Sequence, residues 1–356
     1  MAKQKYYDIT ALLETEAQYM MLLGQRANGK SYQVKQTILK DAYKKGYKFI
    51  YLRRYREDLK QQLVTRYFDD MPINKLTEGI YTGVKAQFGS LYFTYIDVNG
   101  KEQKGDQIGV YCSLNEYERY KSQVFGEEYK YIVYEEFITD NVYLYDEPRL
   151  LQQFVSTVAR HRKITVFLIG NTLSRVCPYF NEWCLEGVLN QKQGTIEIYH
   201  FHLEDDSTVD IAVEYCANIQ AQNKMFFGQT AKQIVTGEWD TKDVPKLPRK
   251  QEEYDLVYEV LVVYQKFKFV LQLLVEPQNG GRIVFIYPYT GHREIKRIIS
   301  NEFSDDYFTS SMLDNKKRPE ALILECFRLN KICFSDNMTG SDFRNVNKVF
   351  RIGTML

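Results

Sequence analysis

What the chain lacks excludes several classes of protein. Its 356 residues include six cysteines without a Cys-x-x-Cys pair and only four histidines, so neither a zinc site nor a disulfide scaffold is expected. No apolar run is long enough to cross a membrane and no signal-peptide pattern is present, which favours a soluble, cytosolic protein with reduced thiols. The net charge is only +1, so any contact with nucleic acid is expected to be a local patch.

The most informative motif follows the apolar run Met20–Leu23, which ends in Gly-x-x-x-x-Gly-Lys-Ser. Gly24 and Gly29 allow a tight turn whose N–H groups face phosphate oxygens. Lys30 would reach the β- and γ-phosphates, and Ser31 would offer its hydroxyl to Mg²⁺. Helical spacing begins directly after the motif, as in a phosphate-binding loop. The predicted ATP-binding residues are therefore Gly24, Gln25, Arg26, Ala27, Asn28, Gly29, Lys30 and Ser31.

A second apolar run, at 48–52, ends in Arg53-Arg54-Tyr55-Arg56. In an open α/β sheet, ligands bind at the carboxyl ends of the strands, so these arginines are expected near the phosphates of a nucleotide or of DNA. The alternative is a solvated turn held by salt bridges to the acidic residues that follow.

A buried strand at Tyr131–Phe137 delivers two adjacent carboxylates, Glu135 and Glu136. This is typical of the second nucleotide-binding motif of an ATPase, in which Glu135 holds Mg²⁺ through water and Glu136 is the general base for the attacking water. A small-molecule kinase is disfavoured, because its substrate supplies the nucleophile. The strand at 164–169 leads to Asn171, which is placed like a sensor of the γ-phosphate.

A helix that opens at Pro148 ends in Arg160-His161-Arg162-Lys163. An arginine supplied to the nucleotide of a neighbouring subunit can accelerate phosphoryl transfer by ~10³–10⁵. We expect Arg160 to have this role, with Arg162 as the second candidate and Arg175 as the third. The alternative is that these residues only cap the helix.

The remaining chain predicts an α/β ATPase domain with a mostly parallel sheet, followed by a smaller α+β domain. We place the ATPase domain at 1–206, a lid or linker region at 207–250 and the second domain at 251–356. The expected strands are 91–98 and 108–112, which flank a turn at Asn99-Gly100, together with 194–202, 256–264, 267–275 and 282–287. The expected helices include 211–219, 293–300 and 319–328.

The second domain offers no convincing set of nuclease carboxylates. Glu259 lies in the middle of a strand, Glu276 precedes a proline, and Asp305-Asp306 lies in an expected loop. Because a two-metal nuclease needs clustered carboxylates, an inactive or binding-only domain is expected.

Several segments together resemble one family, the genome-packaging ATPases of small φ29-type podoviruses, which are related to the large terminase subunits. The resemblance covers roughly 18–180 and rests on the segments Gly24–Tyr32, Phe49–Tyr55, Ile132–Phe137, Thr157–Arg160 and Pro178–Phe180. It implies a homopentameric ring that docks on the portal of an empty procapsid in the host cytoplasm, in some cases through a packaging RNA, and uses ATP and Mg²⁺ to pump double-stranded DNA inward. It also implies that the second domain is a ribonuclease H-like fold without its nuclease residues.

Carried over residue by residue, the resemblance assigns phosphate and Mg²⁺ binding to Lys30 and Ser31, catalysis to Glu136 and Arg160, and DNA gripping or subunit coupling to Arg56 and Lys121. From their positions at the strand end and the helix end, Arg53 and Arg162 are further candidates for DNA binding or subunit contacts. The family usually has Asp where this chain has Glu135. Two alternatives stay open: another P-loop translocase or helicase of nucleic acid, and an interaction module switched by nucleotide.

Overall fold

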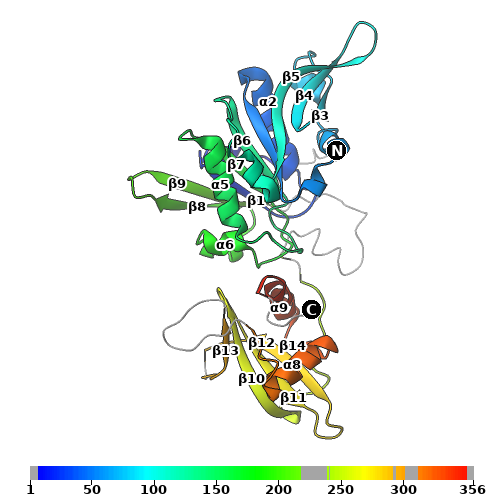
Figure 1. The fold of residues 1–356 in the computed structure, drawn as a ribbon, viewed down its shortest axis with the longest axis vertical. Coiled ribbons are helices and arrows are strands. Elements are labelled where there is room, and N and C mark those ends of the chain that lie inside the picture. Colours follow the sequence, from blue (N-terminus) through cyan, green and yellow to red (C-terminus); the bar gives the residue numbers. More distant parts are fainter. Residues whose placement is uncertain (1–6, 218–238, 240, 292–293, 301–311, 351–356) are drawn as a thin grey trace. The chain divides into compact units, whose positions relative to one another are not determined.

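The computed structural model describes residues 7–217, 239, 241–291, 294–300 and 312–350 (Figure 1). The described chain forms two compact units. Unit 1 contains the residues up to 217, apart from two short segments at 140–143 and 173–176, which belong to unit 2 with the residues from 239 onward. No helix in the described part of the chain is long and apolar enough to cross a membrane.

Unit 1 is built on one sheet of nine strands in the order β3-β4-β5-β2-β6-β7-β1-β9-β8. The pairs β5-β2, β2-β6, β6-β7, β7-β1 and β1-β9 are parallel. The pairs β3-β4, β4-β5 and β8-β9 are antiparallel. The strands are β1 Tyr19–Leu23, β2 Lys48–Arg53, β3 Gly83–Gln87, β4 Ser90–Ile96, β5 Glu102–Ser113, β6 Tyr129–Glu135, β7 Thr165–Ile169, β8 Thr195–His202 and β9 Thr208–Tyr215. The central strands are buried on both faces, as their continuous apolar runs require.

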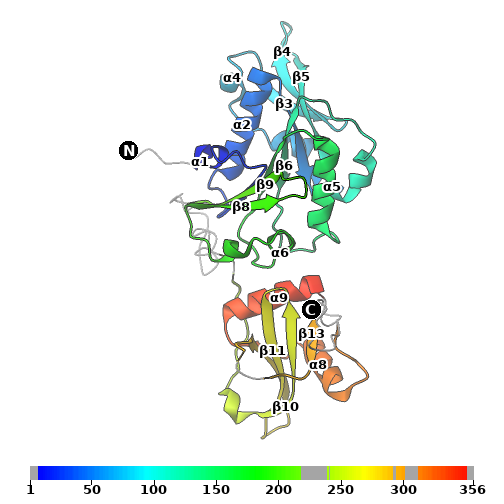
Figure 2. The ribbon, with the colours of Figure 1, turned by 90° about the vertical axis from the view of Figure 1, so that its left-hand side faces the viewer.

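Two long helices, α2 (Lys30–Lys45) and α5 (Glu147–Ala159), lie on opposite faces of this sheet (Figure 2). Alternation along the strands sorts the side chains between the faces, so that Met20 and Leu22 belong to the same core cluster as the α2 residue Val34. α2 is capped after Lys45 by Gly46 in the left-handed conformation, φ 66°, which favours glycine. The shorter helices are α1 Thr10–Leu13, α3 Gln61–Arg66, α4 Ile73–Leu76 and α6 Pro178–Glu182, with 3₁₀ turns at Arg56–Leu59, Leu114–Tyr120 and Glu186–Leu189.

Unit 2 has a sheet of five strands in the order β13-β10-β11-β12-β14. The meander predicted from the sequence is confirmed as β10 Asp255–Tyr264, β11 Phe267–Val275 and β12 Arg282–Pro288, while β13 Ile298–Ser300 and β14 Ile332–Phe334 pair in parallel with β10 and β12. The helices are α8 Arg318–Arg328 and α9 Asn337–Phe350, and a 3₁₀ turn spans Gln251–Glu253. The buried Phe343 of α9 packs against Phe327 of α8 and Phe334 of β14, which joins both helices to the sheet.

Two predictions of secondary structure are wrong. Within the helix expected at 211–219, residues 211–215 are instead the end of strand β9, which pairs in parallel with β1. The predicted linker at 207–250 therefore contains a strand of the large sheet. The segment expected to form a helix at 293–300 ends instead in strand β13. Asp305-Asp306 lies outside the described residues.

Candidate nucleotide site

The phosphate-binding loop connects β1 to α2 and is shaped by its two glycines. Gly24 has φ 143° and Gly29 has φ 101°, a region of backbone conformation that favours glycine. α2 begins at Lys30, so the N–H groups of its first turn and the positive end of its dipole face the same space as the loop. The local geometry is that of an anion site, as the motif predicts.

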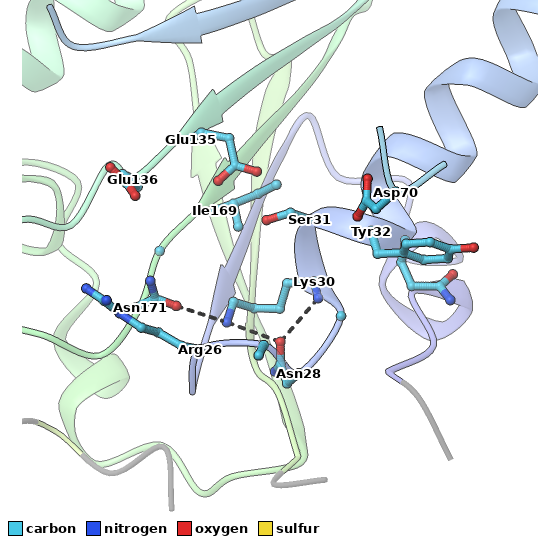
Figure 3. A pocket seen from close by; sticks show the side chains of 14 residues that line it. Arg26, Asn28, Lys30, Ser31, Tyr32, Asp70, Glu135, Glu136, Ile169 and Asn171 are labelled. Atoms are coloured by element: carbon cyan, nitrogen blue, oxygen red, sulfur yellow. Dashed lines mark hydrogen bonds between the residues drawn. The ribbon is translucent and has the colours of Figure 1, made fainter. Parts of the chain in front are cut away.

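Lys30 is buried at the centre of this loop, with 4% of its surface exposed. Its Nζ donates to the carbonyl oxygen of Gln25 at 2.6 Å. It also donates to Oδ1 of Asn28 at 3.2 Å and to Oδ1 of Asn171 at 3.5 Å (Figure 3). Burial lowers the pKa of Lys30 to about 8, although the nearby Glu135 opposes this shift. The amine is thus held in place by neutral oxygens, and an anionic ligand would favour its charged form.

A cavity of about 620 Å³ opens beside the loop. It joins residues 26–31 of the predicted loop to Glu135, Glu136 and Asn171, which come from separate parts of the sequence, whereas Gly24 and Gln25 do not line it (Figure 3). Nδ2 of Asn28 is buried and has no hydrogen-bond partner in the described structure. A buried donor without a partner is costly, so the loop is suited to an acceptor-rich ligand such as a nucleotide triphosphate.

Glu135 is the buried member of the carboxylate pair, with 7% of its surface exposed. It accepts a hydrogen bond of 2.5 Å from the phenol of Tyr67. Burial raises the pKa of Glu135, and the hydrogen bonds from Tyr67 and Ser31 partly offset that rise. The Ser31 hydroxyl and the Glu135 carboxylate are neighbouring hard oxygen donors that both line the cavity, which fits Mg²⁺.

Glu136 has a different environment, because the chain turns sharply after β6. The residue adopts φ 57°, a left-handed conformation, and its side chain is 60% exposed. Its carboxylate accepts a 2.6 Å hydrogen bond from Nη2 of Arg53, which also lies 3.6 Å from Asp58. Glu136 therefore faces the cavity as an ionic partner of Arg53 and is available to a water molecule there.

The three arginines at the end of β2 have three separate environments, which corrects the expectation that all of them meet phosphates. Arg53 pairs with Glu136 as described, and Arg56 pairs with Glu116 at 3.1 Å on the surface. Arg54 is buried with 6% of its surface exposed, so it cannot reach DNA. Alternation at the end of the strand turns Arg53 and Arg54 in opposite directions.

The candidate trans-acting arginines also differ. Arg160 follows α5 with φ 42°, is exposed, and donates to the carbonyl oxygen of Gln123 at 3.3 Å; it is not among the residues that line the cavity of its own chain. Arg162 is held by backbone carbonyls, among them that of Gly126 at 2.5 Å. Arg175 pairs with Asp342 at 3.2 Å within unit 2. Arg160 thus keeps the surface position that its predicted role requires.

Lys121, the remaining predicted contact residue, is exposed and pairs with Glu118 at 2.6 Å. Three further residues escape a motif search. Tyr67 contacts Glu135, and Tyr32 and Asp70 line the cavity. Tyr67 and Asp70 reach the site only through the fold, because they follow helix α3 rather than a strand. Tyr32 directly follows the motif, and that position was its only signal.

Comparison with known proteins agrees with this geometry. A family model described as podovirus DNA encapsidation protein (Gp16) matches residues 1–233. The DNA packaging proteins of Bacillus phage phi29 and Bacillus phage PZA are each 27% identical over 219 residues, which are 59% of this chain and 57% of each relative. The chain thus matches little more than half the length of these relatives. The solved bacteriophage Phi-29 viral genome packaging motor assembly has a chain of similar fold, with a TM-score of 0.55 at 19% identity over 96% of this chain and 97% of that one.

Proposed function

The chain belongs to the podovirus DNA encapsidation protein (Gp16) family, and from this premise we propose that it is an ATP-driven motor that moves double-stranded viral DNA into a preformed procapsid. The observation that carries the proposal is the cavity that joins the phosphate-binding loop to Glu135 and Glu136. A loop that cradles phosphates needs no second glutamate for binding alone, so the pair supports hydrolysis.

The residues divide the chemistry of ATP hydrolysis between them. Lys30 and the N–H groups of the loop would bind the phosphates, and the contact of Asn171 with the Lys30 amine at 3.5 Å supports a role for Asn171 in sensing the γ-phosphate. Ser31 and Glu135 would hold Mg²⁺, which when bound neutralises charge that develops on the phosphate oxygens. Glu136 accepts the proton of the attacking water once its carboxylate leaves Arg53.

Arg160 is proposed to complete the site of a neighbouring subunit. It is exposed and separate from the cavity of its own chain, as a residue acting in trans must be. A head-to-tail interface that repeats around a closed ring would bring each Arg160 to the next nucleotide. The family resemblance favours a ring of five subunits docked on a portal protein, with or without a packaging RNA.

Contact with DNA is proposed to involve phosphates and to be independent of sequence. Arg56 and Lys121 are exposed cations of unit 1 that are offset by Glu116 and Glu118, and Arg53 is engaged with Glu136. Because such contacts release counterions, DNA-stimulated turnover should weaken steeply as salt increases. Unit 2 is proposed to be a nuclease-like module without nuclease chemistry that binds portal, RNA or DNA.

The test is a packaging assay with the purified full chain. ATP turnover is measured with the protein alone, with double-stranded DNA, and with DNA and empty procapsids, while nuclease-protected DNA is scored in parallel. We expect protected DNA only when ATP, procapsids and protein are all present. Turnover stimulated by single-stranded DNA without protection would favour a helicase or another translocase. Tight nucleotide binding with negligible turnover in every condition would favour a switched interaction module.

A further inference from the structure

Arg54 is the one arginine of the 53–56 segment whose side chain turns into the core of unit 1 rather than toward the cavity or the surface. An arginine is always charged and is rarely buried without a partner. Its position, one residue after the cation that holds the Glu136 carboxylate, raises the question of which groups it contacts.

The guanidinium of Arg54 contacts the main chain at the proposed catalytic base. Its Nη1 donates to the carbonyl oxygen of Glu136 at 3.1 Å, and its Nη2 donates to the carbonyl oxygen of Phe137 at 2.6 Å. Glu136 adopts the left-handed conformation, φ 57°, which is unfavourable for a residue with a side chain. Two hydrogen bonds to consecutive carbonyls fix this turn where it would otherwise relax.

The opposite edge of the same guanidinium is held by Glu147, the first residue of α5, which is fully buried. Glu147 accepts from Nε of Arg54 at 2.7 Å and from its Nη2 at 3.0 Å. It also accepts from the phenols of Tyr134 at 2.7 Å and Tyr179 at 3.0 Å, and from the N–H of Leu144 at 2.9 Å. The carboxylate is thus anchored by β6, α6 and the approach to α5, and it orients the Arg54 fork.

A buried ion pair is a poor source of stability, because apolar residues of the same volume often do as well. The value of this pair lies in its geometry, since a planar guanidinium can bind a carboxylate along one edge and aim two N–H groups along another. No apolar side chain can hold two carbonyls in fixed positions.

We propose that Arg54 is a positioning residue for hydrolysis, anchored by Glu147, that holds the main chain of Glu136 so that the carboxylate projects into the nucleotide cavity. One arginine thus positions the backbone of the base, while its neighbour Arg53 engages the side chain. The inference rests on the proposed role of Glu136 and deepens it. The reaction itself is unchanged, because Arg54 acts through Glu136 and does not touch the nucleotide cavity.

The test compares Arg54→Lys, which keeps the charge and loses the fork, with the exposed Arg66→Lys as a matched control. Affinity for a fluorescent ATP analogue and the rate of single-turnover hydrolysis are measured on the full chain with DNA and empty procapsids present. We expect Arg54→Lys to bind the analogue within about twofold of wild type and to hydrolyse ATP about 10–100-fold more slowly, as small displacements of a catalytic group do. The control should match wild type in both measurements.

The decisive readout is the double variant. If Arg54 acts through Glu136, then Arg54→Lys adds no further loss to Glu136→Gln, because there is no base left to position. Additive losses, a large loss of analogue affinity, or unchanged hydrolysis in Arg54→Lys would each overturn the proposal. Full turnover by Glu136→Gln alone would instead overturn the proposed function of Glu136, whatever Arg54 does.

Glu147→Asp supplies a second variant should Arg54→Lys fail to fold, as judged by circular dichroism and thermal unfolding. It keeps the carboxylate and withdraws it from the guanidinium. The expected pattern is the same: retained analogue binding, slower hydrolysis and no additional loss with Glu136→Gln. If Glu147→Asp folds and loses analogue binding, the cluster is only structural and the proposal is wrong.

Discussion

At the residue scale, the adjacent glutamates at the end of β6 differ in burial and in hydrogen-bond partners, which fits the two different roles proposed for them. Glu135 is buried and takes a short hydrogen bond from Tyr67, whereas the side chain of Glu136 is exposed and faces Arg53. A fixed, buried carboxylate suits a metal whose water shell must be oriented. An exposed carboxylate at a turn can release its arginine partner and accept a hydrogen bond from a water molecule instead, which suits a general base.

Tyr67 should therefore influence metal use rather than ATP binding. Tyr67→Phe removes the 2.5 Å hydrogen bond to Glu135 and leaves the aromatic ring against Tyr51. We expect the Mg²⁺ concentration for half-maximal turnover to rise about 10-fold, as is common when the partner of a metal ligand is lost. The measurement is an Mg²⁺ titration at saturating ATP, with Tyr95→Phe, at an exposed position of β4, as the control. An unchanged titration would show that Tyr67 does not support the metal ligand.

Lys30 should decide nucleotide affinity. Lys30→Ala removes a charged donor from the loop, and hydrogen bonds to charged groups contribute about 1.5–3 kcal/mol, so affinity for an ATP analogue should fall about 10–100-fold. Fluorescence titration measures this, with the exposed Lys45→Ala at the other end of α2 as the control. Equal affinities for the two variants would contradict the assignment of the loop.

The site residues that can be predicted from the sequence belong to short continuous segments, whereas those that cannot are in contact across long sequence separations. Lys30 and Ser31 follow from a continuous motif, and Glu136 follows from the end of a strand, so short stretches suffice. Arg54 and Glu147 are 93 residues apart, and nothing in either local sequence indicates that they meet. Their contact depends on how α5 packs on the sheet, which no local pattern encodes.

At the element scale, the sequence was most ambiguous where a short apolar run had no clear period. Residues 211–215 read Ile-Ala-Val-Glu-Tyr, which fits one face of a helix or a buried strand. These residues form a strand because they pair in parallel with β1. Without this strand, the backbone N–H and C=O groups along that side of β1 would have no partners. The three residues of β13 are too few to show any period.

The start of α8 is held by a buried carboxylate, which gives a prediction for unit 2. Glu320 accepts from Nε and Nη2 of Arg297 at 2.8 and 2.9 Å and from the N–H of Asp314 at 2.5 Å. Burial pushes the pKa of Glu320 upward, but the hydrogen bonds from Arg297 and Asp314 outweigh it and hold the pKa below its usual value. The carboxylate thus stabilises the folded state when ionised.

Glu320→Gln should lower the free energy of unfolding of unit 2 by about 3 kcal/mol at pH 7, since it leaves Arg297 without its charge partner. The folded-state pKa is lowered, so this contribution is complete above the usual glutamate pKa of about 4.3 and is lost as pH falls through the folded value. Urea unfolding of the full chain at pH 7 and at lower pH measures both effects. A difference that stayed constant on acidification, or that matched the exposed control Glu252→Gln, would count against this role.

At the scale of the whole molecule, the proposed catalytic groups are divided between the cavity and a surface position outside it. Lys30 and Glu136 line the cavity, whereas Arg160 lies outside it in the same chain. A single subunit is therefore expected to be a poor ATPase, and assembly should complete the site.

Mixing two inactive variants tests this division. Arg160→Ala subunits keep an intact base, and Glu136→Gln subunits keep an intact arginine. In mixed assemblies some interfaces should pair the two intact groups, so ATP turnover should exceed that of either variant alone. Titration of one variant into the other under packaging conditions measures it. Turnover that stays at the level of the separate variants would remove the support for Arg160 as the trans-acting residue.

The most direct measurement of the central claim is DNA protection by Glu136→Gln in the procapsid assay, with ATP binding measured on the same preparation. We predict that the variant binds ATP as the wild type does, hydrolyses it about 10²–10⁴-fold more slowly, and protects no DNA. DNA protected at the wild-type rate by this variant would contradict the claim that hydrolysis in this cavity drives the DNA inward.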